Sequence, residues 1–126
     1  MTYKPEGHSD ISIYMVASDA KAVLAFAAQV FGATELMRIE HPDGAIRHAE
    51  FRIGDSVVMV AQGNDTYTPF PVWLHLYVPD VDATFRAALA AGAEPVQEPA
   101  QKDDPDRRGG VKDPAGNTWW IATSSG

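Results

Sequence analysis

The sequence predicts an α+β fold built from two βαβββ modules, because the same series of motifs occurs twice. In each half an apolar, strand-like run ends at an Asp, a helical pattern follows, and the helix ends at a Gly-Ala pair. A later Gly in each half, Gly54 and Gly116, begins another matching strand pattern. The matching motifs lie about 60 residues apart, and such a repeat predicts one fold of two paired halves with a cleft where they meet.

Length and composition predict one domain with a hydrophobic core. The chain has 126 residues, of which 45% are hydrophobic, and it contains three Trp, five Phe and four Tyr. This apolar content is typical of a folded chain rather than a disordered one. We therefore expect a single domain over residues 1–126, with one module over about residues 10–63 and the other over about residues 72–124.

Charge and cysteine content exclude several kinds of partner and site. The net charge of −7 argues against nucleic acid, because phosphate contacts require a basic surface. The polar residues 1–9 have no apolar core of a signal peptide, and no apolar run approaches the roughly 20 residues of a membrane span. Cysteine is absent, which fits a reducing compartment. We expect a cytoplasmic protein without nucleic-acid or membrane partners.

Caps and apolar stripes predict two helices. Asp19 precedes the pattern over residues 20–31, where apolar side chains recur at three- and four-residue spacing. Gly32 follows and favours the left-handed conformation that ends a helix. The same signals predict a second helix from about Val81 to Ala91.

Alternation of apolar and polar residues, with turn-forming residues between the runs, predicts four strands in each half. Residues 102–107 are expected to form a charged loop. The predicted strands cover residues 11–16, 34–40, 45–53 and 56–62 in the first half, and residues 73–78, 94–97, 109–112 and 117–123 in the second.

This arrangement resembles the vicinal oxygen chelate superfamily, which includes glyoxalase I, extradiol dioxygenases and bleomycin-resistance proteins. Within it, the chain looks most similar to PhnB-like proteins. The resemblance covers about Ile11 to Thr123 and implies a homodimer in which curved mixed sheets line a cavity, with the helices outside. The motifs that carry it include Val16-Ala17-Ser18-Asp19-Ala20, Asp43-Gly44-Ala45-Ile46-Arg47-His48-Ala49-Glu50-Phe51, Val78-Pro79-Asp80-Val81-Asp82-Ala83 and Asp113-Pro114-Ala115-Gly116-Asn117.

Alternation also assigns side chains to faces, since neighbours on a strand point in opposite directions. Apolar residues such as Leu74 and Phe51 suit the helix-covered face. Only one of Trp119 and Trp120 can face the cavity, and we expect Trp119 in the core. The side chains expected to line the cavity are Tyr14, His48, Glu50, Arg52, Trp73, His75, Tyr77 and Trp120.

The resemblance also provides a test for a metal site, because metal-dependent members place His, Glu or Gln at four strand positions. In this chain those positions fall on Ser12, Val58 or Met59, Trp73 and Trp120. Apart from a weak Ser hydroxyl, these residue types are not ligands for a divalent metal. We therefore expect no metal and no other cofactor, and neither glyoxalase I nor dioxygenase activity.

The leading expectation is a metal-independent protein that binds a small molecule, with His48, Glu50 and His75 as catalytic residues. His48 and Glu50 suit acid–base chemistry, although Glu50 would alternatively pair with Arg52 or Arg47 across strands. Arg107 would clamp an anionic group or pair with a neighbouring Asp. The residues expected to bind substrate are Tyr14, Arg52, Trp73, Tyr77, Arg107 and Trp120.

Two alternatives remain open. The first is a sequestering protein, similar to bleomycin-resistance proteins, that holds a cationic drug in an acidic, aromatic cleft without catalysis. The second is a metal-dependent lyase or isomerase with relocated ligands, because His48, Glu50 and His75 would share the cavity face.

Overall fold

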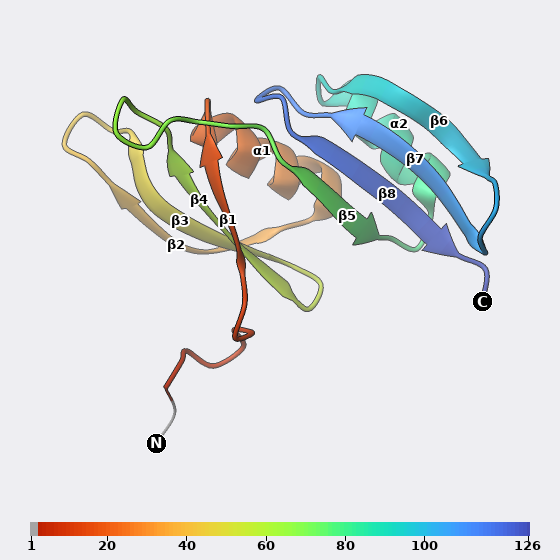
Figure 1. Cartoon of the computed structure of the whole chain (residues 1–126), viewed down its shortest axis with the longest axis horizontal. Coiled ribbons are helices and arrows are strands. Elements are labelled where there is room, and N and C mark those ends of the chain that lie inside the picture. The colour runs from red at the N-terminus through yellow and green to blue at the C-terminus, as the bar shows by residue number, and fades with distance from the viewer. Residues whose placement is uncertain (1–2) are drawn as a thin grey trace. The chain divides into compact units, whose positions relative to one another are not determined.

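The computed structural model describes residues 3–126, so the first two residues of the polar N-terminal segment lie outside it. The chain divides into two compact units, one reaching to Phe70 and the other spanning Pro71–Gly126. Each unit contains one helix and a four-stranded mixed sheet that does not close into a barrel (Figure 1). The predicted α+β class and the two βαβββ modules are therefore confirmed.

The first unit follows the predicted element order. Its strands lie side by side in the order β1-β4-β3-β2, with β1 parallel to β4 and the other neighbours antiparallel. The elements are β1 (Ile13–Ala17), α1 (Ala20–Phe31), β2 (Thr34–Glu40), β3 (Ile46–Ile53) and β4 (Ser56–Gln62).

The second unit repeats this topology, with its strands in the order β5-β8-β7-β6 and a parallel pair formed by β5 and β8. The elements are β5 (Trp73–Tyr77), α2 (Val81–Ala90), β6 (Glu94–Gln101), β7 (Asp106–Lys112) and β8 (Thr118–Ser124).

The hairpin of β6 and β7 is longer than predicted. β6 continues to Gln101 instead of ending at Gln97, and β7 begins at Asp106, so only residues 102–105 of the expected loop over residues 102–107 lie outside the strands. Pro95 and Pro99 conceal the strand in the sequence, because proline lacks an amide donor and the pairing shifts register along this segment. β6 is an edge strand, where such residues are tolerated.

Both helices begin and end as their caps predict. The Asp19 carboxylate accepts a hydrogen bond from the third residue of α1, and Gly32 ends the helix at φ 66°. Asp80 caps α2 in the same way. Within residues 3–126, neither helix has the length or the apolar character needed to cross a bilayer.

Each helix packs against one face of its own sheet, and the core of each unit lies between them. Figure 1 shows α1 behind β1 and β4. The opposite face of each sheet, which we call the open face, has no helix of its unit on it. Buried core residues include Met15, Val23, Phe26, Ala49, Phe51 and Val60 in the first unit, and Phe85, Ala88, Val111, Trp119 and Ile121 in the second.

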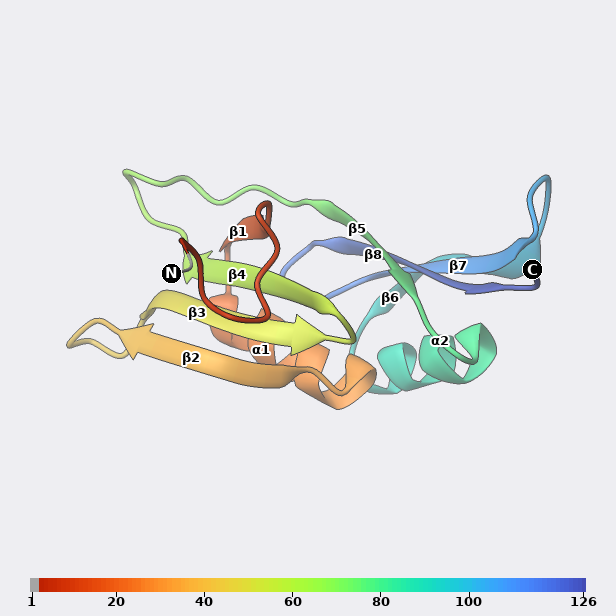
Figure 2. The ribbon, with the colours of Figure 1, turned by 90° about the horizontal axis from the view of Figure 1, so that it is seen from below.

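The segment before β1 turns toward the end of β3, and in the view from below it passes in front of β3 and β4 (Figure 2). The Tyr3 hydroxyl and the Lys4 ammonium both donate to the Asp10 carboxylate at 2.7 Å. Gly7 lies against Arg52 at φ 84°, and a Cβ at Gly7 would stand 2.7 Å from a guanidinium nitrogen. The segment therefore places its next residue, His8, at the open face of the first sheet.

Buried Asp113 holds the turn between β7 and β8. Its Oδ1 accepts from the amides of Ala115 and Asn117 at 2.9 and 3.0 Å, and its Oδ2 accepts from the indole N–H of Trp119 at 2.8 Å. The side-chain oxygen of Asn117 accepts the amide of Val72 at 3.1 Å, which ties the turn to the chain just before β5. Trp119 is buried in the core, as alternation predicts.

We expect Asp113→Ala to destabilise the second unit by roughly 2–4 kcal/mol, because it leaves several buried donors without an acceptor. Asp43→Ala is the control, since exposed Asp43 makes a similar contact in the turn between β2 and β3 of the first unit, where its Oδ1 accepts the Ala45 amide. Its loss should cost about 1 kcal/mol or less. Urea unfolding of both variants measures the difference, and equal costs would contradict the role assigned to Asp113.

Candidate functional site

A chain of hydrogen bonds crosses the open face of the first sheet. The Tyr14 hydroxyl lies 3.1 Å from Nδ1 of His48, and Nε2 of His48 lies 2.8 Å from Oε2 of Glu50. The other carboxylate oxygen of Glu50 lies 2.7 Å from Nε2 of His8. Tyr14 comes from β1, while His48 and Glu50 lie two residues apart on β3 and share a face. Four side chains from three segments thus form one connected group.

Glu50 is the charged centre of this group. Its residue is 8% exposed, and both of its oxygens accept hydrogen bonds from histidines. Hydrogen bonds from His48 and then from His8 hold the pKa of Glu50 below its ordinary value, although burial acts in the opposite direction. A carboxylate only accepts, so each facing Nε2 carries a proton. Neutral His48 then has Nδ1 free to accept from the Tyr14 hydroxyl.

His8 is the member of this group that the sequence did not predict. It belongs to none of the predicted strands or helices, so neither alternation nor helical spacing places it on a face. Its backbone amide donates to the Pro5 carbonyl at 3.2 Å, which forms part of the fold-back before β1. Proximity to Glu50 arises only from that fold-back, and no local sequence signal marks it.

An irregularity in β3 moves Arg47 to the open face. His48 pairs with Ile39, and the next pair is Ile46 with Glu40, so Arg47 has no partner on β2. An extra residue in a strand breaks the alternation of side chains at that point. Ile46 is buried and Arg47 is exposed. Strict alternation would instead have placed Arg47 with Ala49 against the helix.

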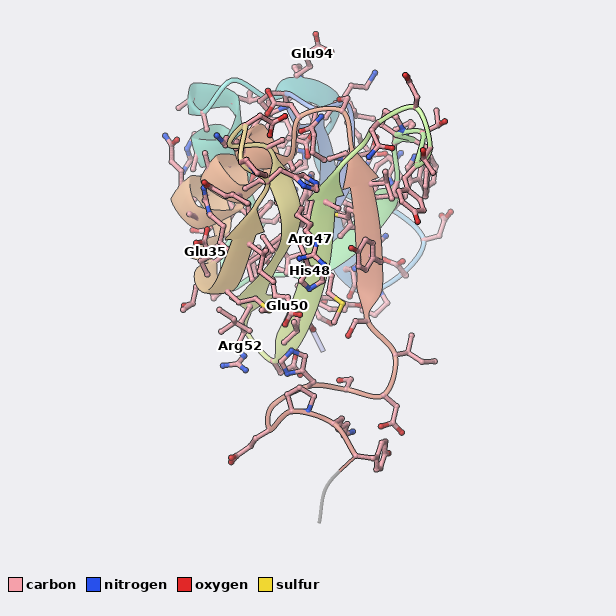
Figure 3. All side chains as sticks on the ribbon, turned by 90° about the vertical axis from the view of Figure 1, so that its left-hand side faces the viewer. Glu35, Arg47, His48, Glu50, Arg52 and Glu94 are labelled. Carbon is pink, nitrogen blue, oxygen red and sulfur yellow. The ribbon has the colours of Figure 1, made fainter. Side chains whose placement is uncertain are left out.

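A cavity of about 480 Å³ lies within the first unit, beside the Tyr14–His48 pair. Its wall includes the connection after β4, where the side-chain oxygen of Asn64 accepts the amides of Thr66 and Tyr67 at 2.9 and 2.7 Å. Figure 3 shows Arg47, His48 and Glu50 in succession along the sheet. The lining residues are Tyr14, Val16, His41, Arg47, Ala61, Gln62, Asn64 and Tyr67.

The open face of the second sheet carries a different polar group, centred on Arg108. Its guanidinium donates to Nε2 of His75 at 3.0 Å, to Asp106 at 3.0 Å and to Asp104 at 3.2 Å. The Tyr77 hydroxyl also donates to Asp106, at 2.7 Å, and this bond raises the pKa of Tyr77. Because arginine only donates, Nε2 of His75 accepts, which describes a neutral imidazole with its proton on Nδ1.

Two tryptophans cover another part of this face. The rings of Trp73 and Trp120 meet edge to face, with centroids 5.3 Å apart. Trp120 lies directly on Gly110, where a Cβ would stand 2.6 Å from the indole. Trp73 is 75% exposed. The second unit therefore fills part of its open face with its own side chains.

Arg107 lies elsewhere than expected. Its guanidinium forms a two-pronged ion pair with Asp82 in the first turn of α2, at 2.8 and 2.9 Å. Because β7 begins at Asp106, alternation directs Arg107 to the helix side and Arg108 to the open face. Arg108 is thus the arginine that bonds to His75, and it is linked to Tyr77 through Asp106.

The expected site residues fall into separate groups. Tyr14, His48 and Glu50 are directly bonded in the first unit, whereas Arg52 lies beneath Gly7 at the end of β3. In the second unit, His75 contacts Tyr77, with ring centroids 4.9 Å apart, and Trp73 contacts Trp120. Within residues 3–126, no three His, Asp or Glu side chains are arranged as a metal-binding group. Convergence of His75 with His48 and Glu50 stays a prediction, because these residues belong to different units.

The lowered pKa of Glu50 generates a testable pH dependence. The charge of Glu50 contributes to the free energy of unfolding above the unfolded-state pKa of about 4.3. This contribution is lost as the pH falls through the lower folded-state pKa of Glu50. We expect His8→Ala to raise the pKa of Glu50 toward its ordinary value, because one donor is lost, while His41→Ala leaves it unchanged. Carbon-13 NMR of the Glu50 carboxyl group measures both. A wild-type Glu50 that titrates at its ordinary pKa would contradict the assigned hydrogen bonds.

Comparison with known proteins identifies the fold independently. Residues 11–121 match the family model of the Glyoxalase/Bleomycin resistance protein/Dioxygenase superfamily. An uncharacterized protein of Mycobacterium bovis is 38% identical over 122 residues, which cover 88% of this chain and 80% of the relative.

Solved structures agree with this match. TioX from Micromonospora sp. ML1 aligns with a TM-score of 0.77 and 29% identity over 92% of this chain and 98% of TioX. A PhnB protein from Bacillus cereus, described as a putative 3-demethylubiquinone-9 3-methyltransferase, aligns with a TM-score of 0.74 and 16% identity over 92% and 100% of the two chains. TnmS3, an antibiotic binding protein from Streptomyces sp. CB03234, aligns with a TM-score of 0.71 and 22% identity over 94% and 100%. The chain belongs to the glyoxalase/bleomycin resistance protein/dioxygenase superfamily.

Proposed function

We propose that this protein binds a small organic molecule at the open face of its first unit and moves a proton to or from it without a metal ion. The observation that carries the proposal is the unbroken chain from the half-exposed Tyr14 hydroxyl through His48 to the buried carboxylate of Glu50. Tyr14 and the cavity lie side by side, so a bound molecule would contact the exposed end of this chain.

Each member of the chain has a distinct part in proton transfer. Glu50 holds the Nε2–H tautomer of His48 and stabilises the imidazolium that forms when Nδ1 takes a proton. The Tyr14 hydroxyl gives its proton to that nitrogen while its oxygen takes one from the ligand. The net step moves one proton from the ligand to His48, and the reverse step returns it. Such chemistry suits an isomerase- or lyase-like reaction that begins by removing a proton beside a carbonyl group.

The residue types at the superfamily's metal positions support a reaction without metal. Met59 lies between Glu50 and Tyr14 in the sheet, and Trp120 packs on Gly110. A thioether and an indole do not fit a site for a hard or borderline divalent ion, which prefers carboxylate oxygen and imidazole nitrogen. The imidazoles of His8 and His48 instead bond to Glu50, and that of His48 also bonds to Tyr14.

The open face of the second unit is proposed as a ligand-binding surface of its own. Trp73, Trp120 and Tyr77 offer aromatic surface, and His75 offers a polar atom beside them. We also infer a cytoplasmic homodimer from the sequence and the superfamily resemblance.

The second candidate function is sequestration without catalysis. Its specific support is the fold similarity to TnmS3, which is an antibiotic binding protein. The exposed Trp73, in edge-to-face contact with Trp120, would offer a surface for a planar ligand. Under this alternative the hydrogen-bonded chain of the first unit orients the ligand but transfers no proton.

The proposed metal independence predicts metal well below one equivalent in protein purified without chelator or affinity tag. Elemental analysis measures the content, and binding of an identified ligand should be the same before and after treatment with EDTA. Stoichiometric metal that is lost in His75→Ala would overturn the proposal. That result would support the relocated site formed by His48, Glu50 and His75.

The acid–base proposal predicts separate effects on turnover and binding, once native mass spectrometry against metabolite mixtures has identified a ligand. We expect His48→Gln and Tyr14→Phe to reduce turnover roughly 10²- to 10⁴-fold, the usual contribution of general acid–base catalysis, with a smaller change in Kd. Tyr3→Phe is the matched control, because Tyr3 bonds to Asp10 outside the site. Recovery of the ligand with unchanged mass after prolonged incubation would favour sequestration instead.

A further inference from the structure

We infer that the ligand of the first unit is an anion, with a carboxylate or phosphate group bound by Arg47 and an adjoining planar part against Tyr14 and Tyr67. The inference rests on the proposed function, because it names the class of ligand for the same site. It differs from what the overall charge of −7 suggests, which is a preference for cations.

The first step of the argument is the direction of Arg47. The register shift opposite Ile39 and Glu40 leaves Arg47 outside the regular pairing and removes it from the helix-covered face. Its side chain then lines the cavity together with Tyr14, which comes from the edge strand β1. A bulge that re-aims one cationic side chain into a cavity is a feature of binding sites rather than of core packing.

The second step is that Arg47 has no ion pair within residues 3–126. Three of the other four arginines on strands have ion pairs: Arg38 bonds to Glu35 at 2.8 Å, Arg107 to Asp82 at 2.8 Å and Arg108 to Asp106 at 3.0 Å. The fourth, Arg52, lies against Gly7 and not in the cavity wall. The chain has 17 acidic and 10 basic residues, so carboxylates are abundant. The nearest one along β3, Glu50, is already bonded to two histidines. The guanidinium of Arg47 is therefore available to a ligand.

The third step is the composition of the cavity wall. None of its eight lining residues is Asp or Glu. The adjoining hollow includes Asp43, whose Oδ1 accepts the Ala45 amide. Besides Arg47, the wall offers His41 and the phenol rings of Tyr14 and Tyr67, which are 47% and 68% exposed. The charge of Arg47 acts on a bound ligand at contact distance. Solvent and salt screen this interaction less than they screen the interaction of the ligand with distant surface carboxylates.

These features select the chemistry of the ligand. A guanidinium binds carboxylate or phosphate through two parallel hydrogen bonds, which gives both affinity and orientation. The two phenols provide flat surfaces for a ring or an enolised carbonyl system and hydroxyls that bond to its substituents. An ammonium group at the same position would face Arg47 and would be repelled.

The experiment uses three probes of nearly equal shape: 2-naphthoate, 2-naphthamide and 2-naphthylmethylammonium. Their Kd values are measured by proton–nitrogen NMR, from the amide shifts of the cavity residues in the full chain. We expect the carboxylate to bind most tightly and the ammonium least tightly. Arg47→Gln should weaken naphthoate roughly tenfold, as expected for the loss of a charge-assisted pair, and leave naphthamide unchanged. Arg86→Gln is the control, because it removes the same charge from α2 of the second unit.

The outcomes separate this inference from the proposed function. The inference is overturned if the ammonium probe binds wild-type protein as tightly as the carboxylate, or if Arg47→Gln binds naphthoate as wild type does. If naphthamide still shifts the cavity amides in that case, the site itself survives and only the charge preference fails. If none of the probes and no metabolite mixture shifts those amides, both proposals fail together. The comparison of the three probes on wild-type protein tests the charge preference even if Arg47→Gln does not fold.

Discussion

The constraint on which the structure depends is that one helix covers only one face of each four-stranded sheet. The first strand of each unit, which precedes the helix, pairs in parallel with the last strand of that unit. Apolar side chains alternate onto the covered face and make the core, as Phe51 and Trp119 do. The remaining side chains of the same strands have no helix to pack on. Polar chemistry is therefore placed on the open faces by the same alternation that builds the core.

The duplicated scaffold carries two different open faces. In the first unit, pairing places Glu50, Met59 and Tyr14 in one row across three strands. The matching row of the second unit is Gly110, Trp120 and His75. Gly110 leaves room for the indole of Trp120, which then occupies the surface itself.

The same row therefore supports a buried carboxylate in one unit and an aromatic surface in the other. Tyr14 ends the row of the first unit and lines the cavity there. The difference between the two rows shows how a repeated topology accommodates unlike sites without a change in the backbone order.

Both open faces stabilise a carboxylate with several donors at once. Glu50 accepts from His8 and His48, while Asp106 accepts from Arg108 and Tyr77. A buried carboxylate is costly unless donors surround it, so each group is held in one arrangement by its partners. A histidine oriented in this way reaches a ligand with its tautomer already set. That preorganisation is what the proposed proton transfer requires.

The sequence by itself determined the two modules, both helix caps and the faces of the regular strands. Tyr14, His48 and Glu50 were predictable as neighbours because alternation is a local property of an extended chain, and Trp119 was separated from Trp120 by the same reasoning. Only the tertiary structure decided the positions of His8 and Arg47 and the exchange of Arg107 for Arg108 at the open face. A fold-back, a bulge and the first residue of a strand depend on pairing with segments distant in the sequence. No local sequence pattern records that pairing, so the positions of His8, Arg47 and Arg108 followed only from the tertiary structure.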